Sequence, residues 1–126
     1  MSNIFILGPC SIENEENYIK SLAYLKPFMK NREWYFKASF DKANRTRIDG
    51  GRGPGLKASL DIFRKVKKEN PNIKLITDVH EPWQAEILAD VIDVVQIPAF
   101  LCRQTDLIVE CAKHFKKINI KKGQWL

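Results

Sequence analysis

The chain has 126 residues, of which 44% are hydrophobic and 29% are charged, a composition typical of a soluble globular protein. This length sets a limit of one domain, and no window is long and apolar enough to span a bilayer. The formal net charge of +6 predicts an anionic partner, either a nucleic acid or a phosphorylated small molecule.

The amino-terminal run Met-Ser-Asn-Ile-Phe-Ile-Leu has neither a basic leader nor a small-residue cleavage site, so it does not resemble a signal peptide. The three cysteines, Cys10, Cys102 and Cys111, have no spacing typical of a disulfide framework or a zinc finger. These features predict a cytoplasmic protein with reduced thiols.

Apolar runs alternate with amphipathic stretches along the chain. The apolar and aromatic runs predict strands at residues 4–9, 33–40, 73–80, 91–99 and 117–121. Helical periodicity predicts helices at residues 11–31, 56–69, 82–88 and 105–115. The first helix is expected to be capped by Ser11 and disturbed at Pro27. This alternation indicates right-handed βαβ units and a parallel sheet in an α/β domain.

The stretch 37–55 is basic and rich in glycine. Its cations are Lys37, Lys42, Arg45, Arg47 and Arg52, and it ends in Gly-Arg-Gly-Pro-Gly. Lysine and arginine donate charge-assisted hydrogen bonds to phosphate oxygens, and glycine lets the main chain approach a ligand closely. Taken alone, the stretch fits a phosphate-binding loop and a solvated surface loop equally well.

Side-chain alternation along the predicted strands places polar residues on one face at their carboxyl ends. The residues on this face are Cys10, Lys37, Ser39, Asp41, Asp78, His80, Gln96, Asn119 and Lys121. Parallel α/β sheets and (β/α)8 barrels have their active sites at this edge. The agreement among five strands predicts a site there.

Nucleic-acid binding is the less favoured interpretation of the positive charge. The basic residues of interest cluster at strand ends and not along one helix. We find no aromatic-basic pattern of a single-strand binder, no recognition helix and no zinc finger in the sequence. The sequence therefore favours phosphorylated small molecules, with no nucleic acid and no membrane as partners.

Four groups of motifs resemble one family of enzymes. They are Gly-Pro-Cys-Ser-Ile-Glu at 8–13; Lys-Ala-Ser-Phe-Asp-Lys-Ala-Asn-Arg at 37–45 with Arg-Gly-Pro-Gly at 52–55; Thr-Asp-Val-His-Glu at 77–81; and Gln-Ile-Pro-Ala-Phe-Leu-Cys-Arg-Gln-Thr-Asp at 96–106 with Asn-Ile-Lys-Lys-Gly-Gln at 119–124. Together they resemble the 3-deoxy-D-manno-octulosonate 8-phosphate synthases, also called 2-dehydro-3-deoxyphosphooctonate aldolases. Related phosphoenolpyruvate-condensing synthases share the shorter pieces and are a less favoured alternative.

The resemblance implies the amino-terminal part of a (β/α)8 barrel, an incomplete barrel with about five parallel strands and four helices. Residues 1–126 would form a single partial domain that ends after the fifth strand. The family condenses phosphoenolpyruvate with D-arabinose 5-phosphate and water. The products are 3-deoxy-D-manno-octulosonate 8-phosphate, used in lipopolysaccharide biosynthesis, and inorganic phosphate. A full-length member would be a homo-oligomer.

The resemblance also implies roles for individual residues. Phosphoenolpyruvate would be bound by Lys37, Ser39, Lys42, Ala99, Lys121 and Gln124. The sugar phosphate would be bound by Asn44, Arg45, Thr46 and Arg103. The catalytic residues would be Asp78, His80 and Lys42. Cys10 would ligate a divalent metal (iron, zinc or manganese), as in the metal-dependent class of the family.

Two features depart from the family pattern. Residues 46–51, Thr-Arg-Ile-Asp-Gly-Gly, replace a run in which the family has a histidine where this chain has Asp49. The chain also has about half of the roughly 250 residues of a typical barrel. The other metal ligands, a histidine, a glutamate and an aspartate, are expected outside it. We therefore expect either half of an active enzyme or an inactive or split half that needs a carboxyl-terminal partner.

Overall fold

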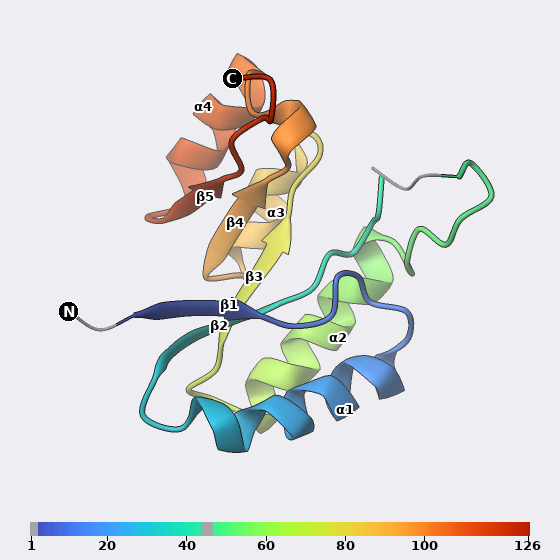
Figure 1. The fold of residues 1–126 in the computed structure, drawn as a ribbon, viewed down its shortest axis with the longest axis vertical. Helices are drawn as coiled ribbons and strands as arrows, with labels where there is room; N and C mark the ends of the chain where they lie inside the picture. The colour runs from blue at the N-terminus through green and yellow to red at the C-terminus, as the bar shows by residue number, and fades with distance from the viewer. Residues whose placement is uncertain (1–2, 44–46) are drawn as a thin grey trace.

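A computed structural model of the chain describes residues 3–43 and 47–126. Within them, parallel strands form one curled sheet in the order β1-β2-β3-β4-β5 (Figure 1). The strands are β1 (Ile4–Leu7), β2 (Glu33–Lys37), β3 (Lys74–Asp78), β4 (Val94–Ile97) and β5 (Ile118–Ile120). The α-helices are α1 (Glu15–Leu25), α2 (Leu56–Glu69), α3 (Gln84–Ala89) and α4 (Thr105–His114). This incomplete (β/α)8 barrel confirms the predicted fold.

The strands are shorter than the sequence predicts, because the chain leaves the regular ladder before its apolar run ends. Beyond β2, the Ala38 N–H still donates to the Ile76 carbonyl (3.3 Å), and the Ser39 N–H donates to the Cys10 carbonyl (3.2 Å). The first bond ties the end of β2 to β3, and the second holds the segments after β1 and β2 together once both strands have stopped. The residues that follow each strand are therefore fixed at the carboxyl edge of the sheet.

The first helix differs from the prediction at both ends. Asn14, and not Ser11, is the N-cap, because Ser11 instead pairs with Ser39 in an isolated parallel bridge. The Asn14 side chain accepts a hydrogen bond from the Asn17 N–H at 2.8 Å. Helix α1 stops at Leu25 and continues as the 3₁₀ helix η1 (Lys26–Met29), with Pro27 in its first turn. The predicted disturbance at Pro27 is confirmed.

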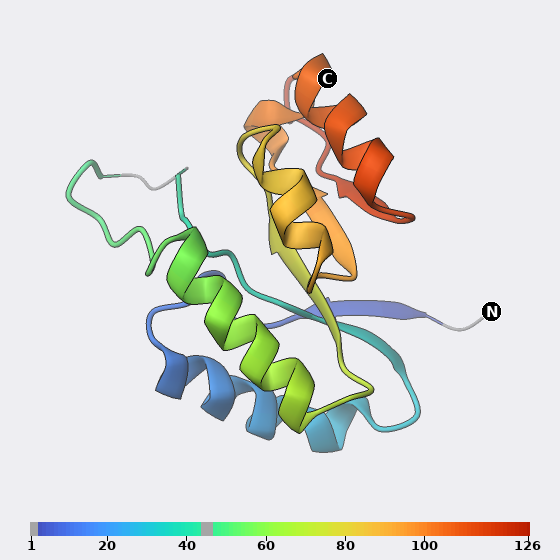
Figure 2. The ribbon, with the colours of Figure 1, turned by 180° about the vertical axis from the view of Figure 1, so that it is seen from behind.

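The main core lies between the sheet and the helices on its outer side. Tyr18 of α1 stacks on Phe36 of β2 with ring centroids 4.7 Å apart, and it meets Phe63 of α2 edge-on at 5.9 Å. Burial of the Tyr18 ring raises the pKa of its hydroxyl well above its usual range. Figure 2 shows α1 and α2 side by side along one flank, with α3 and α4 along the other. The helices thus cover one face of the sheet.

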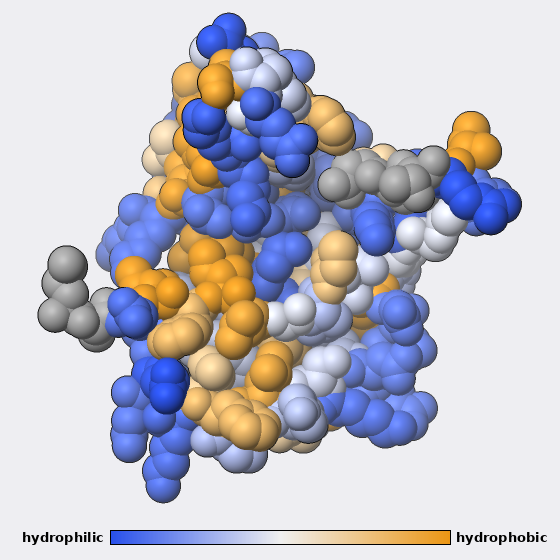
Figure 3. Space-filling view, viewed as in Figure 1, coloured by the Kyte–Doolittle hydropathy of each residue, from blue (hydrophilic) through white to orange (hydrophobic). Residues whose placement is uncertain are grey.

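The other face of the sheet is the barrel interior, and it is only partly covered. Tyr35, Ile76 and Val94 form a small separate cluster there. Ile4 of β1 is 58% exposed, and Figure 3 shows apolar surface over and around this strand. Within the described residues, β1 and β5 each pair on one side only, so both are edge strands. In the same part of the chain, no helix is both long enough and apolar enough to cross a membrane.

Candidate active site at the carboxyl ends of the strands

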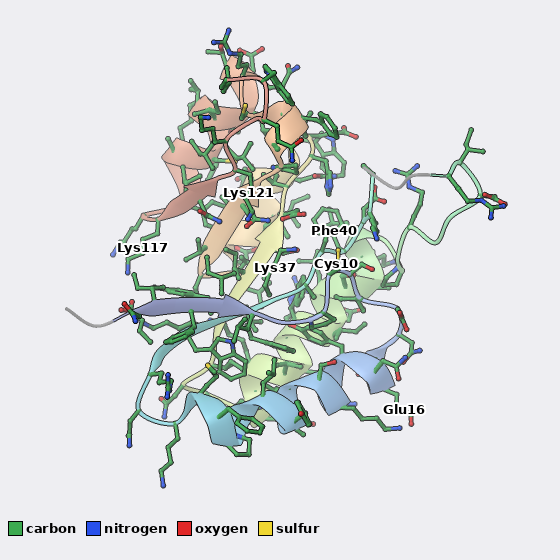
Figure 4. The ribbon with its side chains drawn as sticks, in the orientation of Figure 1. Cys10, Glu16, Lys37, Phe40, Lys117 and Lys121 are labelled. Atoms are coloured by element: carbon green, nitrogen blue, oxygen red, sulfur yellow. The ribbon has the colours of Figure 1, made fainter. Side chains whose placement is uncertain are left out.

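A cavity of about 460 Å³ opens where the strands end. Its walls are Cys10, Lys37, Ser39, Asp41, Lys42, Asp78, Gln96, Pro98, Ala99, Phe100, Lys121, Lys122, Gln124 and Trp125. Figure 4 shows Lys37, Cys10 and Lys121 toward this end of the sheet, whereas Lys117 lies at the other end of β5. Every strand of the sheet thus contributes a residue at or just beyond its carboxyl end, as alternation along the strands predicts.

The structure brings together every residue that the resemblance assigns to phosphoenolpyruvate, and Cys10 with them. Asp78 lines the same cavity, and His80 lies beside it in a smaller one. Arg103 is exposed on the turn before α4 and does not line the cavity. Asn44, Arg45 and Thr46 lie outside the described residues.

A larger hollow, of about 600 Å³, lies at the opposite end of the sheet. It is bordered by η1, by the starts of β2 and β3 and by the turn after α2. Its cations, such as Lys30 and Lys74, are exposed and lie at turns or at the beginnings of strands. Since parallel sheets present functional side chains at their carboxyl ends, we take the smaller cavity as the site.

A line of polar side chains crosses the floor of the site from strand to strand. The Lys37 Nζ of β2 lies 3.9 Å from the Asp78 Oδ1 of β3. The Gln96 Nε2 of β4 donates to the same Oδ1 at 2.6 Å. The Asn119 Nδ2 of β5 donates to the Gln96 Oε1 at 2.7 Å. Asp78, Gln96 and Asn119 stand opposite one another in the strand register, so this line follows from the pairing itself.

The basic loop after β2 is closed at its base by a clasp between Asp41 and Arg52. The Arg52 Nε and Nη2 donate to the two carboxylate oxygens of Asp41 at 2.9 and 2.7 Å. The Lys42 N–H donates to the Arg52 carbonyl at 2.6 Å. Gly53 has φ +106°, and an added Cβ would lie 2.7 Å from the Phe40 carbonyl oxygen, so only glycine fits there. The clasp fixes Lys42 at the edge of the cavity.

Charge pairing within this loop was not foreseen from the sequence. Arg52 pairs with Asp41, and Arg47 pairs with Asp49 through bonds of 3.1 and 2.9 Å. Two of the five cations of the stretch 37–55 are therefore matched with carboxylates within the loop. The sequence indicated the number of cations but gave no sign of these pairs. Lys37 and Lys42 are the described cations of this stretch that line the cavity.

An aromatic pair forms part of the outer wall of the site. Phe100, in the 3₁₀ helix η2 (Ala99–Leu101), stacks on Trp125 with ring centroids 5.7 Å apart and planes at 9°. Both rings are more than half exposed. They come from segments far apart in the sequence, and no local pattern predicts that they meet. They give the cavity an apolar rim above its charged floor.

His80 lies in a cavity of about 160 Å³ that shares Asp78, Pro98 and Phe100 with the main one. Its ring is half-buried edge-on against Phe40 at 5.4 Å, and its Nδ1 has no hydrogen-bond partner among the described residues. Its backbone N–H donates to the Gln84 side chain at 3.0 Å. Burial lowers the pKa of the His80 imidazole, although the charges of Asp41 and Asp78 oppose this shift.

The lowered pKa of His80 predicts a pH dependence of stability. The unfolded chain, with an ordinary histidine pKa of about 6.5, takes up the proton first, so stability falls as the pH decreases through that value. We expect the free energy of unfolding in urea to drop more between pH 7.5 and 5.5 for the wild type than for His80→Gln. His114 is present in both proteins, so its contribution cancels in the difference between their unfolding free energies. Equal losses of unfolding free energy in the two proteins would show that protonation of His80 does not oppose folding.

The chain offers an incomplete set of metal ligands. Cys10 is exposed and lines the cavity, so its thiol is accessible to a metal ion in the site. Within the described residues, no group of three or more histidine, cysteine, aspartate or glutamate side chains could hold a metal ion. The described residues therefore do not complete a metal centre around Cys10.

A partial (β/α) barrel with lysines, a carboxylate and an amide lining a cavity at the carboxyl ends of its strands has the architecture of a barrel enzyme. The family model described as "DAHP synthetase I family" matches residues 2–126, and the chain belongs to this family.

The chain is also similar to curated proteins named 2-dehydro-3-deoxyphosphooctonate aldolase. The protein of Campylobacter jejuni strain RM1221 is 55% identical over 125 residues, which cover 98% of this chain and 46% of the relative. The protein of Helicobacter pylori strain HPAG1 is 51% identical over 126 residues, which cover 98% of this chain and 45% of the relative. The chain therefore spans about half the length of the curated relatives that it matches. The resemblance seen in the motifs is confirmed.

Proposed function

We propose that the chain forms part of a 3-deoxy-D-manno-octulosonate 8-phosphate synthase. This enzyme condenses phosphoenolpyruvate with D-arabinose 5-phosphate and water, releasing phosphate. The observation that carries the proposal is the convergence of Lys37, Lys42 and Lys121 in one cavity at the carboxyl ends of the strands. The similarity to 2-dehydro-3-deoxyphosphooctonate aldolases supports the same activity.

The lysines suit the charge of the substrates. Phosphoenolpyruvate is a polyanion, and a sugar phosphate bound beside it would repel it strongly unless cations lie between or around them. In the proposed complex, Lys37, Lys42 and Lys121 bind the phosphate and carboxylate of phosphoenolpyruvate through charge-assisted hydrogen bonds. Ser39 and Gln124 add neutral hydrogen bonds, and Ala99 offers backbone. The sugar phosphate binds at Asn44, Arg45, Thr46 and Arg103.

Asp78 lines both the main cavity and the smaller one, and His80 lines the smaller one. In the proposed complex the two substrates meet beside these side chains. The lowered pKa of His80 keeps its imidazole neutral near pH 7, so it can accept or donate a proton. Lys42, at the base of the clasped loop, reaches the same region. We assign the proton transfers of the condensation to these three residues.

We propose Cys10 as one ligand of a divalent metal (iron, zinc or manganese), with the remaining ligands supplied by the rest of the protein. A thiolate is a suitable ligand for such metals. The metal would supply Lewis-acid chemistry beside the substrates. A cytoplasmic location and a homo-oligomeric state are proposed on the same resemblance.

A second candidate is a half that needs a partner polypeptide for activity. The specific observation in its favour is the uncovered interior of the sheet, with Ile4 and Ile6 of β1 exposed beside an unpaired edge. A chain carrying the remaining strands of the barrel would cover these residues. It would also bring the metal ligands that the described residues lack.

The test is phosphate release from phosphoenolpyruvate by the purified chain, with and without D-arabinose 5-phosphate. Release that requires the sugar phosphate and stops on chelation supports the metal-dependent synthase. Release that appears only after adding a polypeptide corresponding to the other half of a relative supports the split form. Salt-sensitive binding to random oligonucleotides, with no binding of phosphoenolpyruvate, would overturn the proposal in favour of a nucleic-acid binder.

A further inference from the structure

Gln96 occupies a position that the proposed substrate contacts do not explain. It lies in the middle of β4, is 4% exposed, and has both ends of its amide in use. Its neighbours in the barrel interior one layer below are Ile76 and Val94, which fill the same kind of space with apolar groups. An amide is costly to bury, so filling the interior does not explain it. Gln96, unlike Ile76 and Val94, lies in the layer of the barrel interior that borders the cavity.

The hydrogen bonds of Gln96 run in one direction. Asn119 donates its Nδ2 to the Gln96 Oε1, which leaves the Gln96 amide nitrogen facing Asp78. The Asp78 Oδ1 then accepts from this nitrogen at 2.6 Å. Among the described residues, no group donates a hydrogen bond to the second oxygen, Oδ2. Because a carboxylate only accepts, Asp78 requires the amide nitrogen of Gln96 to face it, and the hydrogen bond from Asn119 reinforces this orientation. The amide of Gln96 in turn holds the carboxylate in place.

The held carboxylate stays at a distance from Lys37. The Lys37 Nζ lies 3.9 Å from the Asp78 Oδ1, longer than a direct hydrogen bond between an ammonium and a carboxylate. Both side chains are about four-fifths buried, so little water separates their charges. A free Asp78 side chain would close this gap. The Lys37 ammonium would then spend a donor on Asp78 and not on a ligand in the cavity.

We propose that Gln96 is a positioning residue that holds the Asp78 carboxylate away from Lys37 and so keeps the Lys37 ammonium available to an anionic ligand. Asn119 supports this role by fixing the amide of Gln96. The claim about the ligand rests on the proposed function, since phosphoenolpyruvate is the anion expected there. The claim about the distance between Lys37 and Asp78 does not.

The first test replaces the amide in two ways. Gln96→Met removes both hydrogen bonds at similar volume, and Asn119→Asp offers an acceptor that turns the Gln96 amide over, so that its oxygen faces Asp78. In crystal structures of both variants without ligand, the gap from the Lys37 Nζ to the Asp78 carboxylate should shorten to about 2.8 Å. A gap that stays as in the wild type would overturn the proposal.

The second test measures binding of phosphoenolpyruvate to the purified chain by calorimetry. We expect the affinity to fall about tenfold in Gln96→Met and in Asn119→Asp. Adding Asp78→Asn to Gln96→Met removes the competing carboxylate, so the affinity should recover in the double variant. A loss of packing alone would not be reversed in this way, and an unrecovered affinity would overturn the proposal.

The matched control is Thr77→Val. Thr77 precedes Asp78 on β3, is fully buried, and its hydroxyl has no hydrogen-bond partner among the described residues. This change alters a buried polar residue of the same strand without touching the line from Lys37 to Asn119. It should leave both the gap and the affinity as in the wild type. If the wild type itself does not bind phosphoenolpyruvate, the proposed function fails, while the ligand-free structures still decide the role of Gln96.

Discussion

Replacement of Gly8 by alanine is expected to destabilise the fold by about 3 kcal/mol or more. A Cβ added at Gly8 would lie 1.9 Å from the Lys37 carbonyl oxygen and 2.8 Å from the Lys37 backbone nitrogen. These atoms belong to the neighbouring strand, so the contact is relieved only by moving β1 away from β2. The free energy of unfolding, measured in urea by circular dichroism, reports the loss.

Gly51→Ala is the matched control for this change. An added Cβ at Gly51 meets no atom within 4 Å, so its effect should stay within about 0.5 kcal/mol. Movement of β1 in Gly8→Ala would also carry Cys10 away from Lys37, because Cys10 follows Gly8 by two residues and the added Cβ meets the backbone of Lys37 itself. Equal stabilities of Gly8→Ala and Gly51→Ala would show that β1 does not approach β2 as closely as described.

Lys37→Met is expected to weaken binding of phosphoenolpyruvate by about 10- to 100-fold. The side chain keeps its apolar stem but loses a largely buried ammonium that lines the cavity, and with it one charge-assisted hydrogen bond to the ligand. Calorimetric titration of the purified chain gives the affinity directly.

Lys20→Met provides the same change in net charge away from the site. Lys20 lies on α1, is 70% exposed and pairs at the surface with Glu16 at 2.7 Å. Such a pair contributes little, so the affinity should change less than about twofold. If both variants lose affinity equally, the effect is one of overall charge, and Lys37 has no direct contact with the ligand.

The elements that the sequence predicted well are those with local signals at both ends. Helix α2 begins and ends at the predicted residues, because Gly55 with φ +88° precedes it and Asn-Pro follows it. The predicted N-cap of α1, Ser11, was wrong. Ser11 instead forms a bridge with Ser39, a contact between segments far apart in sequence. Residue type alone predicted the N-cap, but the pairing of Ser11 with Ser39 in the folded chain determines that Asn14 caps the helix.

In the candidate site, too, features set by local geometry were predicted from the sequence, and contacts between distant segments were not. Alternation along a strand is local geometry, so the sequence predicted correctly that Lys37, Asp78 and Gln96 face one cavity. His80 has the same parity as Asp78 but lies in a separate, smaller cavity. The reason is that β3 ends at Asp78 and the Gln84 side chain then bonds the His80 N–H. Neither the clasp of Asp41 with Arg52 nor the stacking of Phe100 on Trp125 has a local sequence signal.

The order of strands in the sheet is the order of strands in the chain. Each strand therefore pairs with the strand synthesised just before it, and only one helical crossover must close for each strand that joins the sheet. On the ribosome, the strands can dock one after another without waiting for distant segments. Because the line from Lys37 to Asn119 takes one residue from each of β2 to β5, the floor of the site would be assembled stepwise. It would be complete only when Asn119 of the fifth strand arrives to fix the amide of Gln96.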